Sequence, residues 1–128
     1  MDRLALLVVL FLAVGCDPVI PIELVNETED TLSVKTHRTI HFRSDDVHTI
    51  GLSGDYRHSW ITFKVAPSST IGCGSAIAGI EDEMPFTDLV ITKANGDSIV
   101  ALGEKEVLGL FDRGVLGGLE TPYRITVR

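Results

Sequence analysis

The sequence predicts an all-β fold: a small antiparallel β-sandwich or partly open barrel of about eight short strands, after an N-terminal signal peptide. Short runs rich in Val, Ile and Thr recur after residue 20, and turn-forming residues separate them. Residues 60–66, WITFKVA, alternate so that Ile61, Phe63 and Val65 share one face. Asn95-Gly96 between two β-branched runs is the strongest short-range signal for a hairpin.

The N-terminal segment predicts a cleaved signal peptide. Twelve apolar or small residues run from Leu4 to Gly15 behind Arg3. A membrane-spanning helix needs roughly 20 apolar residues, whereas the apolar part of a secretory signal needs roughly 7–15. We therefore expect a signal peptide at residues 1–15, a lipidated tether at residues 16–19, and a single β-sandwich domain at residues 20–128.

The residues at the expected cleavage point resemble the lipobox of bacterial lipoproteins. Small residues, Ala13-Val14-Gly15, precede Cys16, and a thiol is the only side chain that accepts the lipid. The resemblance implies that Cys16 carries diacylglycerol and that its new amino terminus is acylated, for example with palmitate. It further implies a lipoprotein of the bacterial cell envelope, held on the inner or the outer membrane. Alternatively, an ordinary signal-peptidase site leaves Cys16 able to pair with Cys73 in an oxidising compartment.

The rest of the chain is similar in texture to small, uncharacterised β-rich lipoproteins of Gram-negative envelopes. The likeness lies in IELVNETEDTLSV at residues 22–34, in the Asn-Gly hairpin, and in the last strand, YRITVR, at residues 123–128. It implies location and says nothing of activity.

The first strands are predicted to form two hairpins. Residues 20–25 and 31–36 flank a polar turn, and Pro21 places the first of them at a sheet edge or has the strand begin there. Residues 38–42 and 47–52 flank RSDD in the same way.

The second half of the chain contains the strongest hairpin prediction. A type I′ turn at Asn95-Gly96 would place Ile91 opposite Val100 and Leu89 opposite Leu102, in the middle of the fold. Residues 68–84 predict a loop with one helical turn at 76–83, and residues 104–111 predict a short helix followed by a loop.

The charge of the chain limits its partners. The formal net charge is −7, and it stays −7 without residues 1–15 because these contain one acid and one base. Such an acidic domain is not expected to bind nucleic acid, nor to attach to anionic lipid by charge alone. We expect membrane attachment through the lipid anchor.

Three histidines suggest a metal site. His37 and His41 lie two alternations apart on a predicted strand, and a two- or four-residue turn would pair His41 with His48 across the hairpin. Imidazoles so placed could hold one metal ion. In the alternative interpretation these histidines are polar residues on a solvated face.

An aromatic and basic stretch suggests a binding surface. Tyr56, Arg57 and Trp60 are of the residue types that dominate protein-binding hot spots. An envelope protein or a glycan is the expected partner. Trp60 could equally be an ordinary core aromatic.

No catalytic constellation is expected. Cys73, in GCGSA, fits a small buried residue better than a nucleophile, because no base can be assigned to it. The sequence therefore favours a non-enzymatic, lipid-anchored β-sandwich with a binding or structural role and no cofactor beyond the lipid on Cys16. The alternative is a periplasmic metal-binding protein that uses His37, His41 and His48.

Overall fold

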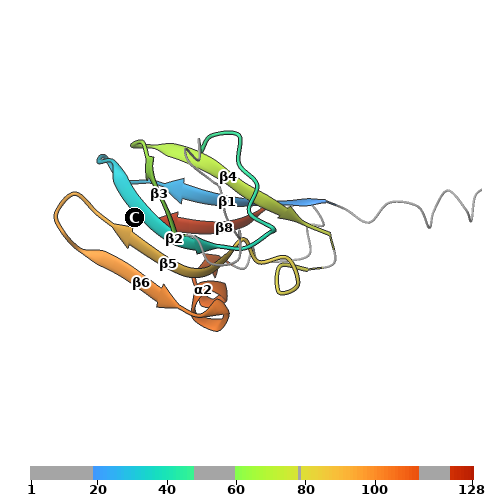
Figure 1. Cartoon of the computed structure of the whole chain (residues 1–128). Helices are drawn as coiled ribbons and strands as arrows, with labels where there is room; N and C mark the ends of the chain where they lie inside the picture. The colour runs from blue at the N-terminus through green and yellow to red at the C-terminus, as the bar shows by residue number, and fades with distance from the viewer. Residues whose placement is uncertain (1–18, 48–59, 78, 113–121) are drawn as a thin grey trace, which may run out of the picture.

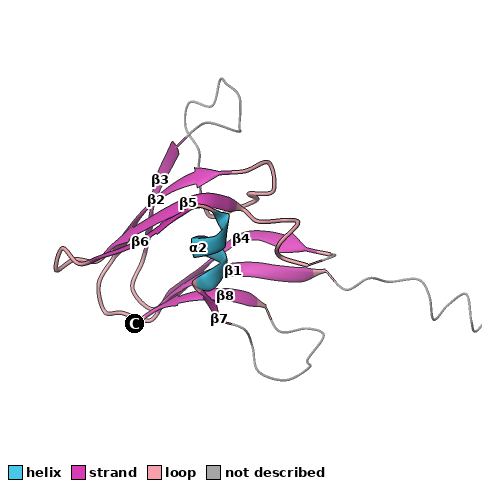
Figure 2. Cartoon of the chain, turned by 90° about the horizontal axis from the view of Figure 1, so that it is seen from below, coloured by secondary structure: helices cyan, strands magenta, loops and turns pink. Residues whose placement is uncertain are grey.

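The computed structural model describes residues 19–47, 60–77, 79–112 and 122–128, which form two four-stranded β-sheets packed face to face (Figures 1 and 2). One sheet has the strand order β4-β1-β8-β7 and the other β3-β2-β5-β6. The predicted all-β sandwich is confirmed, but it is not purely antiparallel, since β1 and β8 run parallel. The elements are β1 (Ile20–Asn26), β2 (Leu32–Arg38), β3 (Trp60–Val65), β4 (Ser69–Ala76), β5 (Phe86–Thr92), β6 (Ser98–Leu102), α2 (Glu104–Gly109), β7 (Phe111–Asp112) and β8 (Tyr123–Val127).

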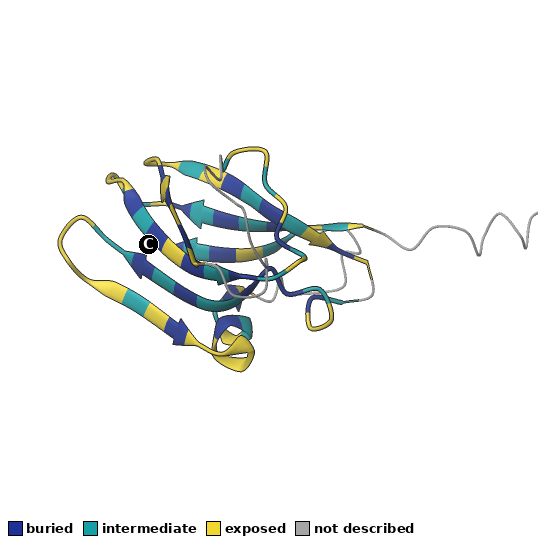
Figure 3. Cartoon of the chain, in the orientation of Figure 1, coloured by how far each residue is buried: buried dark blue, intermediate teal, exposed yellow. Residues whose placement is uncertain are grey.

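A single core lies between the two sheets. Alternate side chains of each strand point inward, as Figure 3 shows by the alternation of buried and exposed segments. The alternation predicted for residues 60–66 is confirmed, with Ile61, Phe63 and Val65 buried. The core also contains Ile22, Leu24, Leu32, Val34, Phe86, Leu89, Ile91, Ile125 and Val127.

The short helix α2 fills the open side between the two sheets (Figure 2). Its Val107 is fully buried, and its backbone follows directly from β6 and leads into β7. Gly103 precedes the helix at φ +90°, a conformation that glycine adopts without a steric cost. The helix predicted at 104–111 is thus confirmed, although it ends at Gly109 and a short strand follows.

The predicted first hairpin is wrong. β1 and β2 follow each other in sequence but belong to different sheets, because β1 pairs with β4 and β8 while β2 pairs with β3 and β5. The intervening loop therefore crosses from one sheet to the other. β1 is a central strand, so Pro21 is not at an edge; it lies at the strand's start, before the pairing with β8 begins at Ile22.

A buried asparagine holds this crossing loop. Asn26 is 1% exposed, and its Nδ2 lies 2.8 Å from the carbonyl oxygen of Asp30, 3.1 Å from that of Val65 and 3.0 Å from that of Ala66. Its Oδ1 accepts hydrogen bonds from the backbone N–H and the hydroxyl of Thr28. Asn26-Glu27-Thr28 has the spacing of a glycosylation sequon, but the amide nitrogen that a sugar would occupy is used inside the fold.

The predicted second hairpin is also wrong in its first arm. β2 ends at Arg38, and residues 39–42 form a turn in which Phe42 N–H donates to the Thr39 carbonyl over 3.3 Å. The backbone N–H of Thr39 donates to Pro85 O and its hydroxyl to Met84 O, so this residue is fixed to a different segment. Of the second arm, predicted at residues 47–52, all but Val47 lie outside the described residues.

The β5–β6 hairpin exists, but its register differs by one residue from the prediction. Ile91 pairs with Ile99 and Leu89 with Ala101. Gly96 N–H donates to Lys93 O, and Gly96 has a positive φ whereas Asn95 does not. This is a type I turn followed by a glycine bulge, which adds a loop residue relative to a type I′ turn. β6 is moreover an edge strand and not central.

The segment predicted as a loop at residues 68–84 contains the edge strand β4. Gly74 (φ +152°) lies so close to the His41 carbonyl that an added Cβ would be 2.8 Å from that oxygen. Close approach of a second backbone explains the glycine here. The predicted helical turn is reduced to a single turn at Ile80–Glu83, where Glu83 N–H donates to Ile80 O.

The two ends of the sandwich differ in which strand ends they contain. We call the end where β1, β3 and β5 begin and β2, β4 and β6 finish the proximal end. The distal end consists of the loops at residues 27–31, 66–68 and 93–97. Among the described residues, no helix is long and apolar enough to cross a membrane.

Candidate functional site

The outer face of the β3-β2-β5-β6 sheet carries an ordered row of side chains at the proximal end. Strand register places Trp60 of β3 beside His37 of β2, His37 beside Asp88 of β5, and Asp88 beside Leu102 of β6. We call these four residues the Trp60 row. Trp60 is 45% and Leu102 57% exposed, so an apolar side chain stands at each edge of the sheet with a polar pair between them.

Trp60 lies on the surface and is held there by its neighbours. Its ring stacks on the His37 imidazole at a centroid distance of 5.3 Å and an interplanar angle of 18°. The Lys35 ammonium lies over the indole, 5.1 Å from its centroid. The alternative interpretation of Trp60 as a core aromatic is therefore wrong, because its side chain projects on the side opposite to Ile61.

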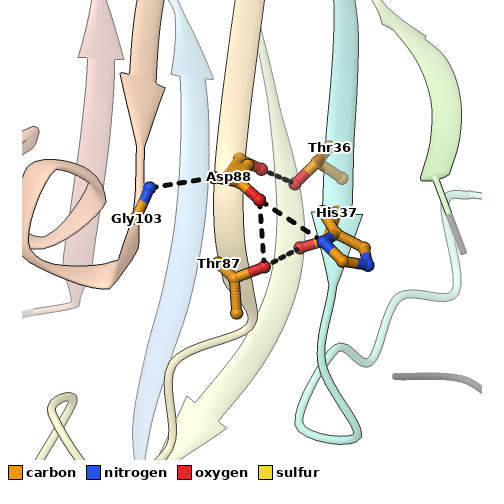
Figure 4. A network of polar contacts seen from close by, with 5 residues as sticks. All are labelled: Thr36, His37, Thr87, Asp88 and Gly103. Carbon is orange, nitrogen blue, oxygen red and sulfur yellow. Dashed lines mark hydrogen bonds and ion pairs between the residues drawn. The ribbon is translucent and has the colours of Figure 1, made fainter. Parts of the chain in front are cut away.

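A β-bulge brings two side chains of β5 to His37. His37 pairs with Asp88 and Arg38 with Phe86, so Thr87 has no partner of its own on β2. As Figure 4 shows, Thr87 and Asp88 both reach toward His37, and the His37 Nδ1 lies 3.3 Å from the Asp88 Oδ2.

The Asp88 carboxylate is fixed from both sides. Its Oδ1 accepts a 2.8 Å hydrogen bond from the backbone N–H of Gly103, while its Oδ2 lies 3.4 Å from the Thr87 hydroxyl (Figure 4). The Asp88 carbonyl also accepts a 2.7 Å hydrogen bond from the Thr36 hydroxyl. These contacts restrict the side chain to one position, so the row is a preorganised surface.

The row does not assemble a nucleophile and a base. The Thr87 hydroxyl lies 3.2 Å from the His37 carbonyl oxygen and donates to it, so its proton is not directed at the imidazole. The geometry suits contact with a partner through an aromatic ring, an aliphatic side chain and a fixed carboxylate.

A cleft of about 280 Å³ opens beside the row. Thr87, whose hydroxyl lies 3.4 Å from the Asp88 Oδ2, lines this cleft. The exposed carboxylates of Glu81, Asp82 and Glu104 line it too, together with His41. The buried Arg38 forms part of the wall. The cleft thus extends the Trp60 row with an acidic rim.

The histidines predicted to share a metal ion do not share a strand face. His37 lies on the outer face of β2, whereas His41 lies within the turn after the strand and lines the cleft. His48 lies outside the described residues. Within residues 19–47, 60–77, 79–112 and 122–128, no three His, Cys, Asp or Glu side chains are grouped as a metal site requires. The strand pairing on which the prediction rested is wrong, since residues 39–42 form a turn.

Cys73 is a buried free thiol. It is 0% exposed in β4, and its Sγ lies 3.7 Å from the Ile71 carbonyl. Burial raises the pKa of the thiol from about 9.0 to about 12. The thiolate is the reactive form, so this cysteine has the properties of the small core residue that the sequence favours.

Several predicted site residues lie outside the described residues: the lipid acceptor Cys16, and Tyr56 and Arg57 of the aromatic stretch. Trp60 is the described member of that stretch. Sequence reasoning missed Lys35 as the cation over its ring, and Asp88 and Leu102 as the other members of the row. Period-two alternation places Lys35 and His37 on one face, but only the pairing of the strands shows which residues lie beside them.

Comparison with known proteins gave no relative: no protein-family model matches the chain, and searches of curated proteins and of solved structures found no match either.

Proposed function

We propose that this protein is a lipid-anchored β-sandwich of the bacterial cell envelope that binds a protein partner through the Trp60 row. Cys16 would carry the anchor, and the domain would act by binding and not by catalysis. The observation that supports the binding role best is an exposed tryptophan held on a sheet face by His37 and Lys35.

The Trp60 ring is preorganised for binding. Trp side chains dominate interface energetics, and a ring that is already stacked loses little rotational freedom on binding. Leu102 at the other edge of the row and Val100, 54% exposed in the next row, add apolar surface. Part of the Trp60 ring is already covered by His37 and Lys35, which leaves less of it for stacking on a sugar and favours a protein partner over a glycan.

The anchor is tested by mass spectrometry of the mature protein from a bacterial membrane fraction. We expect a chain that begins at residue 16 with a diacylglyceryl thioether and an acylated amino terminus. The Cys16→Ser variant should lack both. An unmodified Cys16, or a disulfide between Cys16 and Cys73, would contradict the anchoring proposal.

The binding face is tested by photo-crosslinking in cells. A photoreactive amino acid at Thr62, which is exposed next to Trp60 on β3, should give a discrete protein adduct that disappears when Trp60→Ala is added. The same probe at Asn95, exposed at the distal end, is the matched control and should give none. Adducts that persist without Trp60 would refute the row as the binding site. Trp60-dependent sedimentation with purified peptidoglycan or lipopolysaccharide would instead identify a glycan partner.

A further inference from the structure

The exposed large apolar side chains gather at the proximal end. In the described part of the chain they are six, and five of these belong to that end, while Val100 lies one row further in. The distal loops of the described structure expose charged, polar and small residues together with Pro67, and none of the large exposed apolar side chains lies in them. The five proximal residues are Val19, Ile40, Trp60, Ile77 and Leu102.

Three of them form what we call the apolar tip: Val19, Ile40 and Ile77, which are 61%, 55% and 51% exposed. Val19 comes directly before Ile20 of β1 and Ile77 directly after Ala76 of β4, and Ile20 pairs with Ala76, so the two flank the ends of neighbouring strands.

Backbone contacts hold the tip in place. Ile40 is in the turn that is fixed by the Thr39 hydrogen bonds to the 84–85 segment. The residue after it, His41, lies against β4 at Gly74. The backbone N–H of Ile77 donates to the Glu83 carboxylate. Ile40 and Ile77 are therefore presented by backbone that hydrogen bonds hold in place, and Val19 directly precedes the first paired residue of β1.

The proposed anchor lies within a short reach of this tip. Cys16 precedes Val19 by three residues, which extend over at most roughly 11 Å. The headgroup layer of one leaflet is roughly 5–8 Å thick. If Cys16 carries the lipid, its acyl chains start at the bilayer surface, and the proximal end of the sandwich cannot be far from that surface.

We infer that the apolar tip inserts into the headgroup layer of the bilayer that holds the lipid anchor, so that the strands run away from the membrane and both outer sheet faces point sideways. This inference rests on the proposed lipidation of Cys16. Aliphatic side chains favour the boundary between headgroups and acyl chains, and three of them orient a domain that the acyl chains already hold.

The charge of the proximal end determines which lipid headgroups it can contact. Exposed Glu81, Asp82 and Glu104 surround the neighbouring cleft, and the chain carries a net charge of −7. Such a surface is repelled by anionic headgroups, so the contact is with zwitterionic lipid. In this orientation the Trp60 row stays beside the membrane and accessible to a partner.

The test uses the full mature lipidated chain in phosphatidylcholine vesicles. The variants Ile40→Cys and Ile77→Cys are each labelled at the new cysteine with an environment-sensitive fluorophore. Asn95→Cys, labelled in the same way, is the matched distal control. The wild-type chain provides the blank, since Cys73 is buried and Cys16 is acylated. We expect blue-shifted emission, quenched by nitroxide lipids, for the labels at residues 40 and 77 and neither effect at residue 95.

Co-flotation with the vesicles separates the two proposals. A chain that does not float has lost its anchor, which refutes the proposed lipidation. A chain that floats while the labels at residues 40 and 77 remain unquenched refutes the apolar tip alone. A blue shift without quenching by nitroxide lipids would show contact with protein and also refutes it.

Discussion

The distal and proximal ends of the sandwich use their side chains for different purposes. At the distal end, the side chain of Asn26 turns inward and satisfies the backbone of the loops, and Asn95 likewise accepts a hydrogen bond from Asp97 N–H. At the proximal end, apolar side chains point to solvent and polar ones such as Asp88 fix their neighbours on the surface. The distal side chains therefore stabilise the fold, and the exposed proximal side chains are the ones to which we assign contacts outside it in our proposals.

Among the positions at the two ends of the sandwich, the largest effect is expected for Asn26→Ala. The substitution removes the amide that lies against three carbonyl oxygens, and buried backbone groups left without partners cost about 3 kcal/mol of unfolding free energy in total. Chemical denaturation measures the loss. Asn95→Ala, at an exposed turn of the same end, should cost less than about 1 kcal/mol. Equal losses of unfolding free energy in the two variants would contradict the structural role assigned to Asn26.

Gly74→Ala is expected to destabilise the fold near the proximal end. A Cβ at this position would be 2.8 Å from the His41 carbonyl oxygen, at a φ of +152° that disfavours other residues, so we expect a loss of about 2 kcal/mol. Gly72→Ala, two residues earlier on β4, is the matched control because nothing lies within 4 Å of its added Cβ. Thermal unfolding of both variants is the measurement, and an unperturbed Gly74→Ala variant would contradict the close approach.

The buried Cys73 thiol should make the free energy of unfolding decrease at alkaline pH. Its pKa of about 12 in the folded chain lies above the ordinary value near 9.0, so the unfolded chain loses this proton first. The thiol's contribution is complete below pH 9 and decreases as the pH rises toward 12, by at most about 1.4 kcal/mol per pH unit. Denaturation of wild type and Cys73→Ala across this range isolates the effect. Parallel curves for the two proteins would show that the thiol is not buried as described.

The smallest effect on stability is expected for Trp60→Ala. The ring is 45% exposed and its contacts are the His37 stack and the Lys35 ammonium, so we expect a loss of at most about 1 kcal/mol. Phe63→Ala, on the inner face of the same strand, should cost about 3–5 kcal/mol. Denaturation midpoints of the two variants measure this difference. Similar losses of stability in both would contradict the placement of Trp60 outside the core.

The sequence predicts much of this fold because period-two alternation is a local property. It identifies β3 and its inward residues, and apolar runs identify β2, β5, β6 and β8. It does not identify β4, whose Gly and Ser residues pair across a bulge between Ile22 and Glu23. Nor can it distinguish a hairpin from a crossing between sheets at residues 27–31, since both need a short polar loop. That choice depends on Asn26 reaching Val65, 39 residues away.

The candidate site was predictable only in part for the same reason. Trp60 and His37 each attract attention by residue type, but their stacking depends on the pairing of β2 with β3, and the role of Asp88 depends on a bulge that no local pattern indicates.

The parallel pair of β1 and β8 determines the order in which the molecule can be assembled. Glu23 and Arg124, which form a 2.9 Å ion pair across these strands, are 101 residues apart in the chain. When β1 leaves the ribosome, its β8-facing edge stays unpaired until nearly all of the remaining chain has followed. β7 pairs only with β8 in the described sheet, so the β8-β7 half of that sheet cannot form before this late strand. Contacts between such distant residues form slowly, and a nascent chain of this protein must therefore remain incompletely folded until residue 127 has emerged.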